Sequence, residues 1–149
     1  MTITTRQASP RDVDAIAPLF DAYRQFYEQP PALEAARSFI RDRLERHESV
    51  IFVAESEGDM LGFCQLYPTF CSVEAASIFT LYDLFVAHTA RKSGAGRQLM
   101  LAAESHARAA GAVRLDLTTA KDNLRAQSVY ESLDWVRDEI FYTYNKALP

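Results

Sequence analysis

An apolar run, a glycine-containing turn and an amphipathic run follow one another between residues 81 and 110. This order predicts a strand, a turn and a helix. At the start of such a helix several backbone N–H groups lack a partner within the helix, and together with the helix dipole they favour an anion. Glycines in the turn let the backbone approach a phosphate closely. The turn formed by Ser93, Gly94, Ala95 and Gly96 therefore predicts a phosphate site, with positive charge from Arg91, Lys92 and Arg97.

Spacing separates the known kinds of phosphate-binding turn. The chain contains no Gly-x-x-x-x-Gly-Lys-Ser/Thr string, which excludes a Walker A loop. The dinucleotide-binding fingerprint needs a third glycine where Leu99 stands, and it usually places its first glycine directly after the strand. The pattern that remains is Arg-x-x-Gly-x-Gly, formed by Arg91, Gly94 and Gly96.

This pattern resembles the pyrophosphate-binding signature of the GNAT superfamily of N-acetyltransferases. Upstream, residues 5–19 look like the family's first strand and helix, and residues 53–63 look like its central hairpin. Downstream, the chain is similar to the second cofactor motif, Asn-x-x-Ala-x-x-x-Tyr, through Asn123, Ala126 and Tyr130. That motif usually ends in Gly-Phe or Gly-Trp, whereas here Asp134 precedes the tryptophan, and Asp tolerates the left-handed conformation better than most residues.

The predicted elements form a single α/β domain over residues 1–149. We expect strands at 1–8, 50–54, 60–67, 77–87, 113–118 and 140–144, and helices at 10–27, 32–44, 99–110 and 123–133. Ser9 as N-cap, followed by Pro10 and by Asp12 in the first turn, begins the first helix. The GNAT resemblance implies the topology, a mixed and mostly antiparallel central sheet flanked by helices, with strands splayed at the cofactor site.

The same resemblance implies acetyl-coenzyme A as the co-substrate, and we expect no metal. Its pantetheine arm would lie between the strands that end near residues 86 and 118, and would pair with main-chain groups of Phe85, Val86 and Ala87. One of these N–H groups could also stabilise an oxyanion. Plain sheet residues are the alternative, and the sequence does not choose between the two.

Tyr130 is the predicted general acid. The family's reaction is a direct attack of an amine on the acetyl thioester, and the expelled thiolate needs a proton. Tyrosine has an ordinary pKa of about 10, so it is protonated at neutral pH and can give that proton. The alternative is a core aromatic that packs beside Val129 and Leu133.

Asp83 is the predicted catalytic partner on the amine side. A carboxylate inside the apolar run 81–86 is costly unless it is paired or functional. It could act as the base for the incoming ammonium, or it could bind the positive charge of the substrate without any proton transfer. A salt bridge to an Arg or Lys from a neighbouring element is the structural alternative.

Aromatic residues predict where the acceptor binds. Tyr23, Phe26 and Tyr27 cluster before the break at 29–31, and in the family the first helices and the strand near Tyr67 surround the acetyl site. Cation–π contacts there would suit a small cationic amine, in line with a short similarity of residues 81–86 to the diamine acetyltransferase branch. Core packing or a dimer interface is the alternative.

Composition limits the other possibilities. A net charge of −4 argues against nucleic acid as a partner. Cys64 and Cys71 lack the spacing of a zinc site or a redox pair, and no apolar run approaches the roughly 20 residues of a membrane span. We therefore expect a cytoplasmic enzyme, and a homodimer from the family resemblance. The competing function is a non-catalytic acyl-coenzyme A-binding sensor or partner-binding module.

Overall fold

A computed structural model describes residues 2–149, so the first residue of the predicted opening strand, Met1, lies outside it. The chain separates into two compact units, one reaching Thr118 and the other running from Thr119 to Pro149. Each unit is described by itself below, and the single domain over residues 1–149 stays a prediction.

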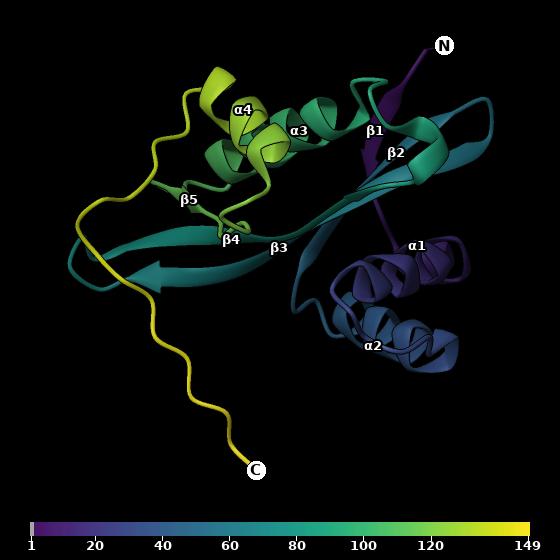
Figure 1. Cartoon of the computed structure of the whole chain (residues 1–149), viewed down its shortest axis with the longest axis horizontal. Helices are drawn as coiled ribbons and strands as arrows, with labels where there is room; N and C mark the ends of the chain where they lie inside the picture. Colours follow the sequence, from purple (N-terminus) through teal and green to yellow (C-terminus); the bar gives the residue numbers. More distant parts are fainter. Residues whose placement is uncertain (1) are drawn as a thin grey trace. The chain divides into compact units, whose positions relative to one another are not determined.

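The first unit is built on a mixed sheet. Among the described residues the sheet has five strands in the order β1-β2-β3-β4-β5 (Figure 1). Neighbours from β1 to β4 are antiparallel, and β5 runs parallel to β4. The strands are β1 (Thr4–Gln7), β2 (Val50–Ser56), β3 (Asp59–Cys71), β4 (Ala76–Val86) and β5 (Leu115–Asp116). The predicted α/β fold with a mixed, mostly antiparallel sheet is confirmed.

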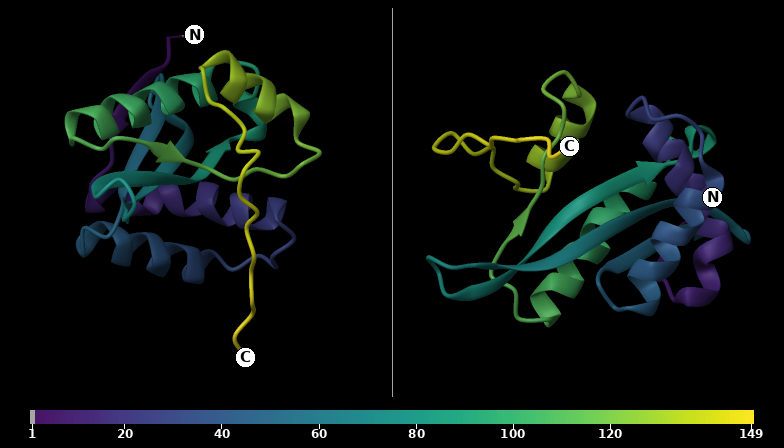
Figure 2. Two further views of the ribbon diagram at one scale, coloured as in Figure 1. Left: turned by 90° about the vertical axis from the view of Figure 1, so that its left-hand side faces the viewer. Right: turned by 90° about the horizontal axis from the view of Figure 1, so that it is seen from below.

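Helices cover both faces of this sheet. The helices α1 (Val13–Phe26) and α2 (Leu33–Glu45) lie together on one face, and α3 (Ala95–Ala109) lies on the other (Figures 1 and 2). The core between the sheet and the first two helices contains Ile16, Phe20, Ile40 and Phe63, all buried. The apolar stripe of α3, Leu99, Met100, Ala103 and Ala107, is buried as well.

A bulge in β4 decides which residues face which helices. Gln65 of β3 lies opposite Asp83, but the next residue, Leu66, lies opposite Leu81, so Tyr82 is an extra residue in β4. Before the bulge, Phe79 contacts His106 of α3. After the bulge, Phe85 contacts Tyr23 of α1. The extra residue therefore turns Asp83 and Phe85 to the face that α1 and α2 cover.

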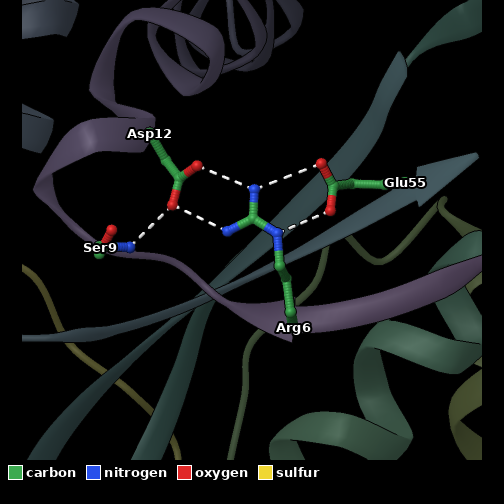
Figure 3. Close-up of polar contacts among 4 residues, drawn as sticks. All are labelled: Arg6, Ser9, Asp12 and Glu55. Carbon is green, nitrogen blue, oxygen red and sulfur yellow. Dashed lines mark hydrogen bonds and ion pairs between the residues drawn. The ribbon is translucent and has the colours of Figure 1, made fainter. Parts of the chain in front are cut away.

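The start of the first helix is held by a partly buried ion-pair cluster (Figure 3). A short 3-10 turn, Pro10–Asp12, precedes α1. The Ser9 N–H donates to the Asp12 carboxylate at 2.8 Å. The Arg6 guanidinium donates to both oxygens of Asp12 at 2.8 and 2.9 Å and also to Glu55 at 2.7 Å. These contacts tie β1 to α1 and β2, and they lower the pKa of Asp12 to about 2.

Replacing Asp12 by Asn will lower the free energy of unfolding at pH 7 by about 1 kcal/mol, a modest value because Arg6 is partly exposed. The amide oxygen of Asn can still accept from the Ser9 N–H, but its amide nitrogen then faces the guanidinium, so the change removes the charge and one of the two acceptors for Arg6. Because the folded-state pKa is lowered, this stability is present above the ordinary carboxyl pKa of about 4 and is lost as the pH falls towards 2. Urea unfolding from pH 2 to pH 7 measures the difference, with the exposed Asp14→Asn as control.

The second unit contains the helix α4 (Leu124–Ser132), followed by residues that form no strand. Asp134 has a φ of +68°, so the aspartate does adopt the left-handed conformation predicted for that turn. The predicted strand at 140–144 is wrong. The Asp138 carboxylate accepts from the N–H groups of Ile140 and Phe141, at 2.8 and 3.2 Å, and this local turn takes the donors that a strand ladder would use.

Candidate active site

The predicted glycine-containing turn is present between β4 and α3. Lys92 and Gly94 both have positive φ, +66° and +92°, which directs neighbouring N–H groups to one side as in an anion nest. The Ser93 hydroxyl accepts from the Ala95 N–H at 3.3 Å, and α3 begins at Ala95. A Cβ built at Gly94 meets no atom within 4 Å, so a ligand has room there. The geometry fits a pyrophosphate, which the exposed Lys92, Arg91 and Arg97 would surround.

Arg91 lies at the end of β4 as well as beside the turn. Its Nε donates to the Val86 carbonyl at 3.3 Å. Its guanidinium lies 5.7 Å from the ring of Phe85 and 5.9 Å from that of Phe26, which belongs to α1. The residue predicted to bind phosphate is therefore also in contact with one of the predicted acceptor aromatics, Phe26.

The outer edge of β4 is unpaired beyond Thr80 in the described part of the chain. β5 pairs with β4 only at Phe79 and Thr80, which makes β5 shorter than the predicted strand at 113–118. The Ala87 N–H donates to Leu61 of β3 at 2.7 Å, so alternation directs the backbone of Val86 to the opposite, outer edge. Of the three residues predicted to pair with the pantetheine arm, Val86 presents its backbone there, whereas Phe85 and Ala87 direct their N–H groups to β3.

Asp83 is 6% exposed and has neutral hydrogen-bond partners only, as far as residues 2–149 are concerned. Its Oδ2 accepts from the Gln65 amide at 2.7 Å, and the Tyr23 hydroxyl, which donates to the Tyr82 carbonyl at 3.4 Å, lies beside the carboxylate. Burial raises the pKa of Asp83, and the contacts with Gln65 and Tyr23 lower it in part. It forms no ion pair within the same range, so the salt-bridge alternative for Asp83 is wrong.

Aromatic side chains surround this carboxylate. The ring of Tyr23 lies 5.9 Å from Phe63, 6.0 Å from Phe85 and 5.3 Å from Tyr27. Tyr67 lies 5.5 Å from Tyr82, and burial together with the charge of Asp83 raises the pKa of Tyr67 to about 12. The structure thus brings together Tyr23, Tyr27, Tyr67, Phe85 and Asp83.

Two of the predicted acceptor aromatics lie at the surface. Phe26 and Tyr27 are 56% and 48% exposed, so neither ring belongs to a fully packed core. Each still contacts the group around Asp83, because Phe26 packs edge-on against Tyr27 at 5.2 Å and Tyr27 packs against Tyr23. Core packing therefore does not account for these two residues.

Two polar residues of this region escape prediction from the sequence. Gln65 is fully buried and hydrogen-bonded to Asp83. The Ser49 hydroxyl donates to the side-chain amide oxygen of Gln65 at 2.6 Å. A signal for Gln65 exists, because an amide between Cys64 and Leu66 interrupts a buried run just as Asp83 does. Ser49 precedes its strand and carries no such signal.

The other predicted motif lies in the second unit. Asn123 is the N-cap of α4, and its Oδ1 accepts from the Ala126 N–H at 3.2 Å, so the motif has a local structural role. Tyr130 is half-buried on α4, with its ring 6.3 Å from that of Trp135. Its catalytic role stays a prediction.

Metal clusters and membrane spans are both absent from the described part of the chain. Residues 2–149 contain no group of three or more His, Cys, Asp or Glu side chains arranged to hold a metal ion. No helix in this range has the length and apolar character needed to cross a bilayer.

Comparison with known proteins places the chain in a family. The model of the Acetyltransferase (GNAT) family matches residues 14–135. YhfO of Bacillus subtilis (strain 168), an uncharacterized N-acetyltransferase, is 47% identical over 144 residues, 97% of each chain. A crystal structure of a probable acetyltransferase has a TM-score of 0.90 at 39% identity, covering 100% of this chain and 99% of that one. An aminoglycoside acetyltransferase from a soil metagenomic sample shares the fold, with a TM-score of 0.81 at 18% identity and coverage of 99% and 97%. The chain is an acetyltransferase of the GNAT family.

Proposed function

We propose that this acetyltransferase moves an acetyl group from acetyl-coenzyme A to the primary amine of a small cationic molecule, by direct attack in a ternary complex. The observation that supports an amine acceptor is the environment of Asp83. Its carboxylate is buried, has no cationic partner among residues 2–149 and is surrounded by aromatic rings. An ammonium group would supply the missing positive charge, and the rings would contact its apolar part.

Each part of the site has a separate task in this proposal. The bound co-substrate supplies an activated acetyl thioester. Backbone N–H groups of the turn at 93–96, with Arg91, Lys92 and Arg97, hold its pyrophosphate, and Val86 offers backbone groups to its pantetheine arm. Asp83 holds the acceptor ammonium and takes its proton, and Tyr130 gives a proton to the departing thiolate.

The test measures thiol release from acetyl-coenzyme A with a panel of alkyl and aryl monoamines, polyamines, amino acids, aminoglycosides and lysine peptides. We expect one class of small cationic amine to respond and lysine peptides to stay inactive. Calorimetric titration of acetyl-coenzyme A accompanies the assay. Tight binding without turnover on any amine would favour the sensor alternative, and absence of binding would contradict the proposed co-substrate.

Three further predictions from the sequence belong to this proposal. The similarity to the diamine acetyltransferase branch, the cytoplasmic location and the homodimer all stay predictions. The panel addresses the first of these, because a response to diamines and polyamines alone would favour that branch. Sedimentation of the purified protein addresses the homodimer.

Replacing Gly62 by Ala will weaken acetyl-coenzyme A binding. A Cβ at position 62 would lie 2.6 Å from the Phe85 carbonyl oxygen and 3.1 Å from the Val86 Cα, both backbone atoms, so the end of β4 must shift. Overpacking of this kind costs about 1–3 kcal/mol of stability. Calorimetry should show a raised Kd. Gly58→Ala is the control, because it strains a turn with no neighbour within 4 Å. An unchanged Kd in Gly62→Ala would mean that Val86 does not contact the co-substrate.

A further inference from the structure

Three buried polar side chains, one just before β2 and two from the strands β3 and β4, form a chain of hydrogen bonds that ends at Asp83. Ser49 stands just before β2, Gln65 in β3 and Asp83 in β4, and they are 9%, 0% and 6% exposed. The Ser49 Oγ donates to the Gln65 Oε1 at 2.6 Å, and the Gln65 Nε2 donates to the Asp83 Oδ2 at 2.7 Å. Gln65 is paired with Asp83 by the register of the strands, so the contact is built into the sheet.

The direction of this chain matters, because a glutamine amide can point either end at its neighbour. The ionised Asp83 carboxylate can only accept, so it selects the orientation in which Nε2 faces it, and the Ser49 hydroxyl then donates to Oε1 on the other side. The opposite orientation would place the amide oxygen against the carboxylate and leave a buried group without a partner, which costs free energy. Ser49 therefore satisfies the buried Gln65 oxygen and holds the amide in place, and Gln65 in turn stabilises the ionised form of Asp83 at one position.

Among the described residues no cation pairs with Asp83, although Arg91 lies against the ring of Phe85, and Arg43 and Glu48 act on Tyr67. Tyr23 faces Asp83 from α1, and burial next to the carboxylate raises the pKa of that hydroxyl. From β3, Tyr67 and the Cys64 thiol both have pKa values raised to about 12, so both are neutral at pH 7. Tyr82 stands next to Asp83 in β4. Neutral donors stabilise the negative charge without cancelling it, whereas an Arg or Lys would compete with a substrate cation.

We infer that Ser49 and Gln65 are positioning residues, which hold the Asp83 carboxylate ionised and oriented to receive the acceptor ammonium. The inference rests on the proposed function in one respect, namely that the ligand of Asp83 is the ammonium group of the acceptor. Its structural part, the control of Asp83 by Gln65 and Ser49, does not depend on it. A purely structural role, in which Gln65 only satisfies buried groups, is the competing explanation.

The experiment compares Gln65→Leu and Ser49→Ala with two control variants. Ser49→Thr keeps the hydroxyl and should restore wild-type behaviour. Ser56→Ala removes a second buried serine, at the other end of β2, whose hydroxyl has no hydrogen-bond partner in the described residues. Two measurements are made on each: kcat and KM for the responding amine from pH 5 to pH 9, and the carboxyl pKa of Asp83 by carbon NMR of aspartate-labelled protein, assigned with Asp83→Asn.

We expect Gln65→Leu to raise the amine KM by about tenfold or more, the usual effect of losing a hydrogen bond to a charged group. The acid limb of kcat/KM and the NMR pKa of Asp83 should both move to higher pH. Ser49→Ala should move them in the same direction by less, and should keep the inference testable if Gln65→Leu does not fold. Ser49→Thr and Ser56→Ala should match the wild type in KM and in the pKa of Asp83. The acetyl-coenzyme A Kd should equal the wild-type value in all four variants.

Two failures can be told apart. If Gln65→Leu and Ser49→Ala lower Tm but leave both the acid limb and the NMR pKa unchanged, the role is structural and the inference is overturned. If the wild-type protein acetylates no amine, the proposed function fails instead. The NMR titration then still decides the structural part, because an unchanged pKa of Asp83 overturns it and a raised one supports it.

Discussion

Replacing Tyr130 by Phe will lower kcat by about 100-fold or more and leave the acetyl-coenzyme A Kd nearly unchanged. A positioned general acid contributes about 10²–10⁴ in rate, and phenylalanine keeps the ring while it removes the proton donor. The ring contact with Trp135 can persist, so α4 should keep its packing. Steady-state kinetics with the responding amine, together with calorimetry, measure the two quantities.

A matched control exists in the same unit. Tyr142 is 90% exposed, and Tyr142→Phe removes a hydroxyl there without touching the Asn-x-x-Ala-x-x-x-Tyr motif. It should leave kcat at the wild-type value. If Tyr130→Phe also turns over normally, Tyr130 has no part in proton transfer, and the thiolate leaves with a proton from another source.

Replacing Asp83 by Asn will abolish most amine acetylation and at the same time raise thermal stability at pH 7. The first effect follows from loss of the charge that binds the ammonium, and we expect kcat/KM to fall by about 100-fold or more. A raised KM with kcat kept would assign Asp83 to binding alone, and a lost kcat would assign it to proton transfer. Acetyl-coenzyme A should bind as in the wild type.

The stability effect has a defined pH dependence. Burial raises the pKa of Asp83 in the folded protein, so ionisation opposes folding. This cost is absent below the ordinary carboxyl pKa of about 4, and it is complete once the pH exceeds the raised pKa of the folded protein. The Tm advantage of Asp83→Asn should therefore grow as the pH rises between these two pKa values. Thermal unfolding between pH 4 and pH 8 measures it.

Asp21→Asn is the control for this second effect. Asp21 is also buried, but its oxygens accept from the Ala32 N–H and the Gln25 amide at 2.9 and 3.2 Å. The substitution should lower Tm, because an amide nitrogen would replace one of the two acceptors. An equal gain in Tm from both substitutions would mean that the Asp83 charge is not the cause.

Local sequence signals predicted the strand, the glycine turn and the helix that follows, because each depends on residues close together in the chain. The turn at 93–96 is a clear case, since Gly94 is needed at its positive φ. Lys92 also has a positive φ, and no local signal marks it. The final strand was predicted from β-prone residues alone, and the Asp138 side chain shows why propensity without a partner is insufficient.

The candidate site was harder to predict, because its geometry depends on pairing between strands. Asp83 was identified as a charge in an apolar run, but the partners of the carboxylate come from register. Gln65 lies opposite Asp83 across β3 and β4, and Ser49 reaches Gln65 from another part of the chain. Sequence patterns within one segment predict neither of these two contacts, because each joins segments that are distant in the chain.

The extra residue in β4 has an evolutionary consequence. If every residue of β4 alternated regularly, with Tyr82 paired like the others, Asp83 would follow Phe79 and Leu81 onto the face that α3 covers, away from Tyr23. Deletion of Tyr82 would instead leave a regular strand in which Leu81 still lies opposite Leu66 and Asp83 still lies opposite Gln65. A lineage could therefore lose this one codon and keep the carboxylate on the side of the acceptor aromatics.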